Sequence, residues 1–257
     1  MAASLVGSRE LTWRLFRRDF SARYRQSLLG YVWAVAPTLL TVLAFAYLNR
    51  AKILPIGPTE LPYPLFAVIG LTVWQVFASG LLKTTQSVAA AGGLIVKINF
   101  AQESLVLAAF LESLFDGLVR TLLVVALFAW YGVAPAWTVV FVPLLLVPLA
   151  MFTLGLGFVL SIANAVFRDF ASGVLLVLTF AMFLAPVVYP PPSAWPHVLV
   201  NYLNPASPFL IATRDLVSGG GLSNPASLLI ASVAGGLMFV CGWRVFRLAM
   251  PRIAERV

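Results

Sequence analysis

Long apolar segments recur along this chain, and their lengths predict membrane-spanning helices. A bilayer core about 30 Å thick requires roughly 20 apolar residues in a helix. Six segments of about this length are separated by shorter polar or proline-rich stretches: about Leu28–Leu48, Leu65–Leu82, Ser104–Tyr131, Trp137–Ala163, Ser172–Val188 and Pro225–Phe246. The pattern therefore predicts an all-α integral membrane protein with six transmembrane helices.

The composition agrees with this prediction and excludes a soluble domain. The 257 residues are 61% hydrophobic and 10% charged, with a mean hydropathy of +0.97. So few polar side chains cannot cover a soluble core of this size, and the apolar excess must face lipid. We expect one transmembrane domain over residues 28–257, after an N-terminal segment 1–27. The one cysteine, Cys241, lies in the last apolar segment and is expected to be a buried, inert thiol.

The distribution of Lys and Arg predicts that both termini are cytosolic. In that orientation thirteen of the basic residues lie in inside segments and only three, Arg50, Lys52 and Arg214, in outside segments. The opposite orientation would invert the ratio, against the excess of positive charge that cytosolic loops carry.

The segment Ser8–Ser27 mixes arginines with apolar residues such as Leu11, Leu15 and Phe16. This pattern predicts an amphipathic helix in the cytosolic interface, with its arginines free to meet phosphates or a partner. A membrane anchor with no further role is an equally good interpretation.

The segment between the second and third apolar segments, Lys83–Glu103, is predicted to be the longest cytosolic loop. Gly92 and Gly93 precede a short apolar stretch that ends at Phe100. This order predicts a turn and then a short helix, at about residues 92–101, that cannot span the bilayer. Exposed apolar residues in such a loop favour docking onto another protein; a loop that lies on the lipid surface is the alternative.

Three charges lie inside the third apolar segment. Glu112, Asp116 and Arg120 follow one another at four-residue spacing and therefore share one helical face. Charges at bilayer depth normally face a bundle interior or water. We expect a buried Asp116–Arg120 pair; a role in gating or in a wet pathway is the alternative.

The outside segment at about residues 189–221 is rich in prolines and ends in three glycines. Two short apolar pieces, His197–Leu203 and Phe209–Val217, lie between these helix breakers. Neither can cross the bilayer, and two short re-entrant helices before the last span would account for both. His197 is the one histidine of the chain, which argues against a metal site or a catalytic base.

Several motifs, taken in order, resemble the permease subunits of O-antigen and related polysaccharide ABC exporters, the type-2 exporter superfamily. The motifs are Arg18-Asp19-Phe20-Ser21-Ala22-Arg23-Tyr24-Arg25-Gln26-Ser27-Leu28-Leu29-Gly30-Tyr31-Val32-Trp33, Gly93-Leu94-Ile95-Val96-Lys97-Ile98-Asn99-Phe100, Phe167-Arg168-Asp169, Ala185-Pro186-Val187-Val188-Tyr189-Pro190, Asn204-Pro205 and Arg214. They cover most of the chain. One departure is Ala101, where a proline often follows the aromatic residue.

The resemblance implies a homodimer that works with two separate ATPase subunits in the bacterial inner membrane and exports a lipid-linked glycan. It also implies the docking site for the ATPase: Gly93, Leu94, Ile95, Lys97, Asn99 and Phe100. The chain has no Gly-x-x-x-x-Gly-Lys-Ser/Thr phosphate loop. We therefore expect no enzymatic activity and no cofactor in this chain, with ATP and Mg²⁺ bound by the partner.

A glycan presents flat apolar faces and many hydroxyls, which suit aromatic and polar side chains. Candidate residues for its path are Arg23, Arg25, Tyr31, Thr38, Thr41, Phe45, Trp74 and Phe77. The same layout fits teichoic-acid, capsule and drug-efflux permeases. An ion-coupled secondary transporter would show paired repeats and midplane polar sites. A membrane-bound enzyme would need a cluster of His, Cys or carboxylates, and the sequence offers neither pattern.

Overall fold

The computed structural model describes residues 9–24, 32–53, 56–91, 100–192 and 199–254, and within these ranges it holds helices and no strand. This confirms the all-α prediction. The helices are α2 (Arg9–Tyr24), α3 (Val32–Arg50), α4 (Tyr63–Ala90), α6 (Glu103–Tyr131), η1 (Trp137–Phe141), α7 (Val142–Leu145), α8 (Val147–Val166), α9 (Phe170–Leu184), α10 (Val200–Leu203), α11 (Ser207–Ser218) and α12 (Pro225–Ala254).

Four helical stretches in the described part of the chain are long and apolar enough to cross a bilayer: Tyr63–Ala90, Glu103–Tyr131, Trp137–Val166 and Pro225–Pro251. The two remaining apolar helices, Val35–Arg50 and Phe170–Leu184, are shorter. A short helix can still span where the bilayer thins or flanking residues reach the interface. The four long stretches are therefore candidate spans by length and composition, and the count of six stays a prediction.

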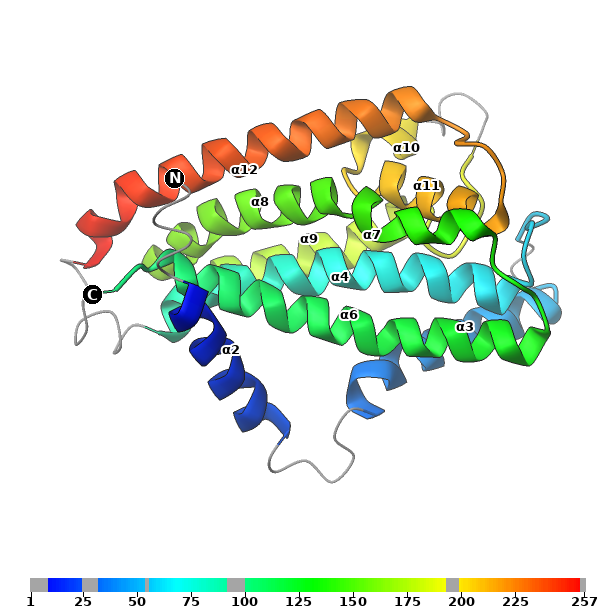
Figure 1. Ribbon diagram of the computed structural model, residues 1–257, viewed down its shortest axis with the longest axis horizontal. Coiled ribbons are helices and arrows are strands. Elements are labelled where there is room, and N and C mark those ends of the chain that lie inside the picture. Colours follow the sequence, from blue (N-terminus) through cyan, green and yellow to red (C-terminus); the bar gives the residue numbers. More distant parts are fainter. Residues whose placement is uncertain (1–8, 25–31, 54–55, 92–99, 193–198, 255–257) are drawn as a thin grey trace.

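The long helices run side by side, and the short ones gather at one end of the bundle (Figure 1). α10 and α11 lie at that end, beside η1 and α7, while α2 and the C-terminal part of α12 lie at the other. The arrangement fits a chain that crosses the bilayer repeatedly and whose two described ends lie at the same end of the bundle. The boundary predicted between residues 27 and 28 lies outside the described residues.

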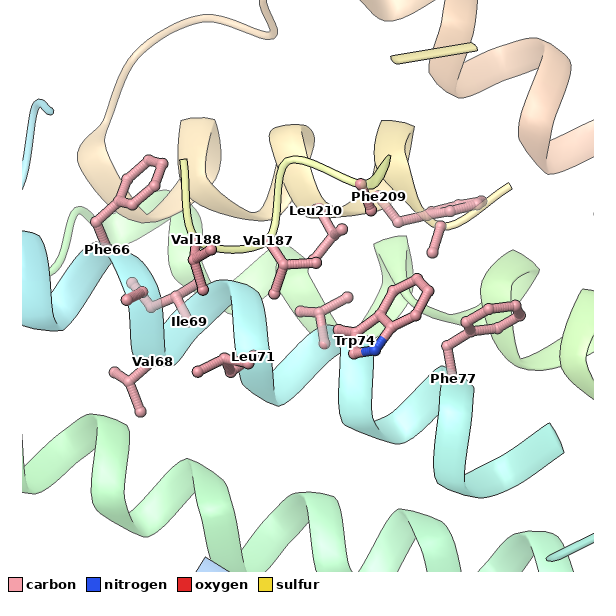
Figure 2. Close-up of a cluster of buried hydrophobic side chains, with 14 of the residues drawn as sticks. Phe66, Val68, Ile69, Leu71, Trp74, Phe77, Val187, Val188, Phe209 and Leu210 are labelled. Atoms are coloured by element: carbon pink, nitrogen blue, oxygen red, sulfur yellow. The ribbon is translucent and has the colours of Figure 1, made fainter. Parts of the chain in front are cut away.

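α4 is the central helix. In its most apolar 18-residue stretch 67% of the residues are buried, against 28% for α6 and 22% each for the span that ends in α8 and for α12. Figure 2 shows Phe66, Val68, Ile69, Leu71, Trp74 and Phe77 along α4, packed beneath Val187, Val188, Phe209 and Leu210. The outer surfaces of the other long helices remain apolar, as lipid contact requires.

Glycines allow α8 and α12 to touch through their backbones. A Cβ added to Gly242 of α12 would overlap the carbonyl oxygen of Gly155 of α8, and one added to Gly235 would overlap that of Pro148. Small residues permit this close approach, which is a main source of packing energy between helices in lipid. Cys241, next to Gly242, is exposed on the opposite face of α12 with Leu237 and Val240. The expectation of a buried thiol is therefore wrong.

α4 is longer than the apolar pattern predicts, because it continues past Leu82 to Ala90. The predicted loop Lys83–Glu103 is therefore wrong in its first part, and Lys83 lies on a helix. No glycine or proline occurs between Gly80 and Gly92, so nothing in the local sequence ends the helix where the apolar run stops.

The α8–α12 contact gives a prediction with a control on the same helix. Gly242→Ala should lower the stability of the purified protein by about 1–3 kcal/mol, because the added methyl group has to displace backbone. At Gly236 the nearest atom to an added Cβ is Cε of Met151 at 4.0 Å. Gly236→Ala should therefore be neutral or slightly stabilising, since alanine favours a helix. Unfolding in detergent micelles measures both, and equal behaviour of the two variants would contradict the packing.

Candidate functional site

A partly buried ion-pair cluster joins α4 to α6. Nζ of Lys83 lies 2.9 Å from Oδ2 of Asp116 and 3.5 Å from Oε2 of Glu112. Asp116 is only 3% exposed. A carboxylate removed from water in this way is strongly destabilising unless a cation is held close to it, and Lys83 supplies one such cation.

Asp116 and Arg120 are both buried, as expected for charges that face the bundle interior. Lys83 is not among the residues expected here, because the apolar run stops at Leu82 and predicts a loop from Lys83 onward. α4 thus contributes an ionisable group, Lys83, to the face of α6 that carries Glu112 and Asp116.

The contact between α4 and α6 continues beside these charges. The hydroxyls of Ser79 and Ser113 are 2.7 Å apart, and Ser113 also donates to the carbonyl of Val76 at 3.0 Å. Gly117 faces the Val76 side chain so closely that an added Cβ would press on it. The part of α4 from Val76 to Lys83 is therefore joined to α6 by polar bonds as well as by packing.

The N-terminal helix α2 packs on α6. The Phe20 ring meets Phe115 edge to face at 4.6 Å between centroids, and Leu15 and Phe16 are buried in the same cluster. The apolar side of this amphipathic helix thus contacts protein. On its exposed side Arg18 pairs with Asp19 at 2.7 Å, and this hydrogen bond raises the pKa of Arg18.

A polar pocket of about 320 Å³ lies between α2, α4 and α6. Arg18 and Asp19 line it from α2, Lys83 and Gln86 from α4, and Glu112 from α6. It extends to Ala90 and Ala91, immediately before the predicted docking stretch.

Of that docking stretch, Gly93, Leu94, Ile95, Lys97 and Asn99 lie outside the described residues. Phe100 is described, and it packs against the cluster that Leu15 and Phe16 belong to.

At the other end of the bundle, Arg214 of α11 is the central polar residue. It is 6% exposed, and it donates to the carbonyl of Pro186 at 2.6 Å and to that of Val187. Its guanidinium lies 3.6 Å from the centre of the Phe66 ring. Burial lowers the pKa of Arg214 to about 9, which leaves it charged at neutral pH.

Gly70 of α4 makes room for this arginine, because an added Cβ would overlap Nη2 of Arg214 and the carbonyl of Val187. Tyr63 donates to the carbonyl of Val188 at 2.9 Å beside it. The bend after α9 is thus held by side chains from α4 and α11, which satisfy carbonyls that no helix ladder uses.

The two short apolar pieces of the outside segment contain helices, α10 and α11, as predicted. Asn204 between them donates to the carbonyl of Ala181 at 3.2 Å and accepts from the backbone N–H of Ala206 at 3.0 Å. Asn204 thus bonds to α9 and Arg214 to the bend that follows α9, so both motif residues hold this part of the chain. That α10 and α11 are re-entrant, dipping into the bilayer from the outer side, stays a prediction.

The candidate residues for a substrate path have different surroundings. Trp74 and Phe77 are buried and pack against each other with ring centroids 5.5 Å apart. Thr38 is buried as well, whereas Phe45 is partly exposed and Thr41 donates to the carbonyl of Pro37. The side chains of Arg23, Arg25 and Tyr31 lie outside the described residues. A substrate path along these residues stays a prediction.

These features define an all-α, multi-pass membrane protein. It has a partly buried charge cluster toward one end, and at the other end side chains of α4 and α11 that bond to the bend after α9. Among the described residues, no group of three or more His, Cys, Asp or Glu could hold a metal ion. The sequence model of the ABC-2 type transporter family matches residues 10–217, and the chain belongs to this family.

Three similar proteins carry the name O-antigen export system permease protein RfbA. Two, from Klebsiella pneumoniae, are 29% and 25% identical, each over 93% of this chain and 91% of the relative. The third, from Myxococcus xanthus, is 31% identical over 74% of this chain and 72% of its own length. The resemblance found in the sequence motifs is confirmed by these matches.

The charge cluster can be tested by a double-mutant cycle. Lys83→Met, Asp116→Asn and the double variant should show a coupling free energy between about 1 and 3 kcal/mol, measured by unfolding in mixed detergent micelles. The exposed pair of Arg14 and Glu10, 2.6 Å apart on α2, is the matched control. Its coupling should stay below about 0.5 kcal/mol, as for other exposed helical pairs. A coupling at Lys83 no larger than this control would contradict a structural role.

Arg214→Lys should destabilise the protein by at least about 2 kcal/mol, because one ammonium cannot reproduce two directed bonds and the stack on Phe66. Arg214→Met should do the same. Arg50→Lys, at an exposed arginine, should leave the unfolding midpoint unchanged. A lysine at position 214 that matches wild-type stability would show that charge alone suffices there.

Proposed function

We propose that this chain is the transmembrane subunit of an ATP-driven exporter that moves a lipid-linked, O-antigen-like polysaccharide out of the cytosol. The observation that carries the proposal is the similarity to O-antigen export permeases, which extends over 93% of the chain in two relatives. The teichoic-acid, capsule and drug-efflux alternatives have no such support among these relatives.

The protein would hydrolyse no ATP itself and would depend on a separate ATPase subunit. Membership of the ABC-2 family supports separate permease and ATPase subunits, and the sequence of this chain lacks a phosphate loop. The ATPase would dock on the stretch Gly93–Phe100. The support for this site is its position, since it directly follows α4, which Lys83 joins to α6.

The export path would run between two copies of the chain in the inner membrane. Side chains such as Leu65, Leu71 and Trp74 fill the interior around α4, so a glycan finds little room inside one bundle. A path between bundles avoids this core, and Trp74 and Phe77 would then lie behind the path and not line it. Both termini would be cytosolic, because the excess of basic residues on that side remains when Lys83 is moved from the loop onto α4.

The proposal predicts that a strain deleted for this gene loses surface polysaccharide and accumulates the lipid-linked precursor. Wild-type protein should restore export, and an ABC ATPase subunit should co-purify with it. The double variant Leu94→Asp/Ile95→Asp should lose the ATPase and export, while its level in the membrane is unchanged.

The control for that experiment is Ile53→Asp, at an exposed apolar residue beyond the end of α3. It should retain both the ATPase and export. Normal surface polysaccharide in the deletion strain would contradict the proposed substrate, and ATPase binding by the Leu94/Ile95 variant would contradict the docking site.

A further inference from the structure

An ion pair joins the first turn of α6 to the C-terminal part of α12, and nothing described so far uses it. Oε1 of Glu103 lies 3.1 Å from Nε of Arg247. Glu103 is only 7% exposed, and a carboxylate buried to this extent requires a cation close to it. Its place in the first turn of α6 also favours a negative charge, because the helix N-terminus carries a partial positive charge. Glu103 is therefore held firmly, and part of that hold comes from another span.

An aromatic ring fixes the direction of Arg247. Its guanidinium carbon lies 4.9 Å from the centre of the ring of Trp243, one turn earlier on α12. Trp243 is itself buried, together with Phe246, in the apolar cluster at this end of the bundle. The ring and the carboxylate together restrict the guanidinium to one position. The arginine side chain is still 46% exposed, so its contribution to stability is modest and variants at position 247 should fold.

The ion pair lies close to the segment 92–99. Glu103 is on the first turn of α6, three residues after Phe100. Ala91 and Phe100, the described residues on either side of the segment, both pack against the apolar cluster that contains Trp243. The two ends of the segment thus meet one apolar cluster, and Glu103 adds a polar bond from there to α12.

The bond has a special position among the contacts of α12. This helix packs chiefly on α8. Of the ion pairs between described residues, the Glu103–Arg247 pair is the one that connects α12 to another helix. Since Arg247 is held against Trp243, a displacement of the first turn of α6 acts on the backbone of α12 and not only on a free side chain.

We propose that the Glu103–Arg247 pair transmits the movement of a bound ATPase subunit from the start of α6 to α12. This inference rests on the proposed function, in which the ATPase docks on Gly93–Phe100. Both residues are positioning residues: without the pair, the ATPase should still bind and hydrolyse ATP, while α12 should respond less to it. A pair with a purely structural role would change the stability of the protein and not this response.

The native cysteine allows the response of α12 to be measured. Cys241 is the one cysteine of the chain, and it is exposed on α12. A nitroxide label on Cys241, in the complex of this chain with its ATPase in lipid nanodiscs, should change its spectrum when ATP and vanadate are added. Glu103→Gln and Arg247→Gln should each reduce this change at least about threefold. The same variants should lower the amount of polysaccharide exported per ATP hydrolysed.

Two further variants separate the ion pair from a general effect of mutation. Arg247→Lys keeps a cation within reach of Glu103 and should retain most of the spectral change. Arg244→Gln removes an exposed arginine one turn earlier on the same helix and should behave as the wild type does. The melting temperature of each complex, measured in parallel, reports any structural contribution of the pair.

An equal spectral change in wild type, Glu103→Gln and Arg247→Gln would overturn the inference and leave the proposed function standing. The same holds if these variants only lower the melting temperature, if the wild type shows no change with ATP, or if Arg247→Lys loses as much as Arg247→Gln. Should Glu103→Gln not fold, Arg247→Gln decides the result. A wild-type chain that binds no ATPase would overturn the proposed function itself, and the inference with it.

Discussion

α4 contacts α3, α6, α8, α9 and α11, so its side chains have to fit five neighbours at once. Its apolar residues form the largest buried cluster, and glycines at positions 70 and 80 admit side chains from α11, α6 and α8. The two polar arrangements of the molecule also depend on α4, because it carries Lys83 near one end and presents Phe66 and Gly70 to Arg214 near the other. Any change in the position of α4 would therefore disturb both the ion pairs of Lys83 and the contacts of Arg214.

At both ends of α4 a charged side chain is largely removed from water, and the two charges are stabilised in different ways. Lys83 is paired with carboxylates from another helix, and removal of either partner would leave the other charge uncompensated. Arg214 is instead held by backbone carbonyls and an aromatic ring. A carbonyl cannot be lost by mutation, so the parts open to change are the arginine, the Phe66 ring and the room that Gly70 provides.

The apolar pattern predicts the long helices well, because membrane thickness fixes their length; α6 begins and ends within one residue of its predicted range. The same criterion fails at Lys83, where the helix continues for two turns after the apolar run has stopped. The pattern also locates the short helices of the proline-rich segment but says nothing of Arg214, since its partners are carbonyls 27 and 28 residues away. Contacts between distant segments depend on packing geometry, which one sequence does not display.

The backbone contact between Gly155 and Gly242 has a consequence for motion. If α12 slid along α8 by part of a turn, a residue with a side chain would take the place of a glycine and strike the facing carbonyl. The two helices are therefore locked in axial register. A movement that begins at one end of this pair would then reach the other end as a common tilt of both helices.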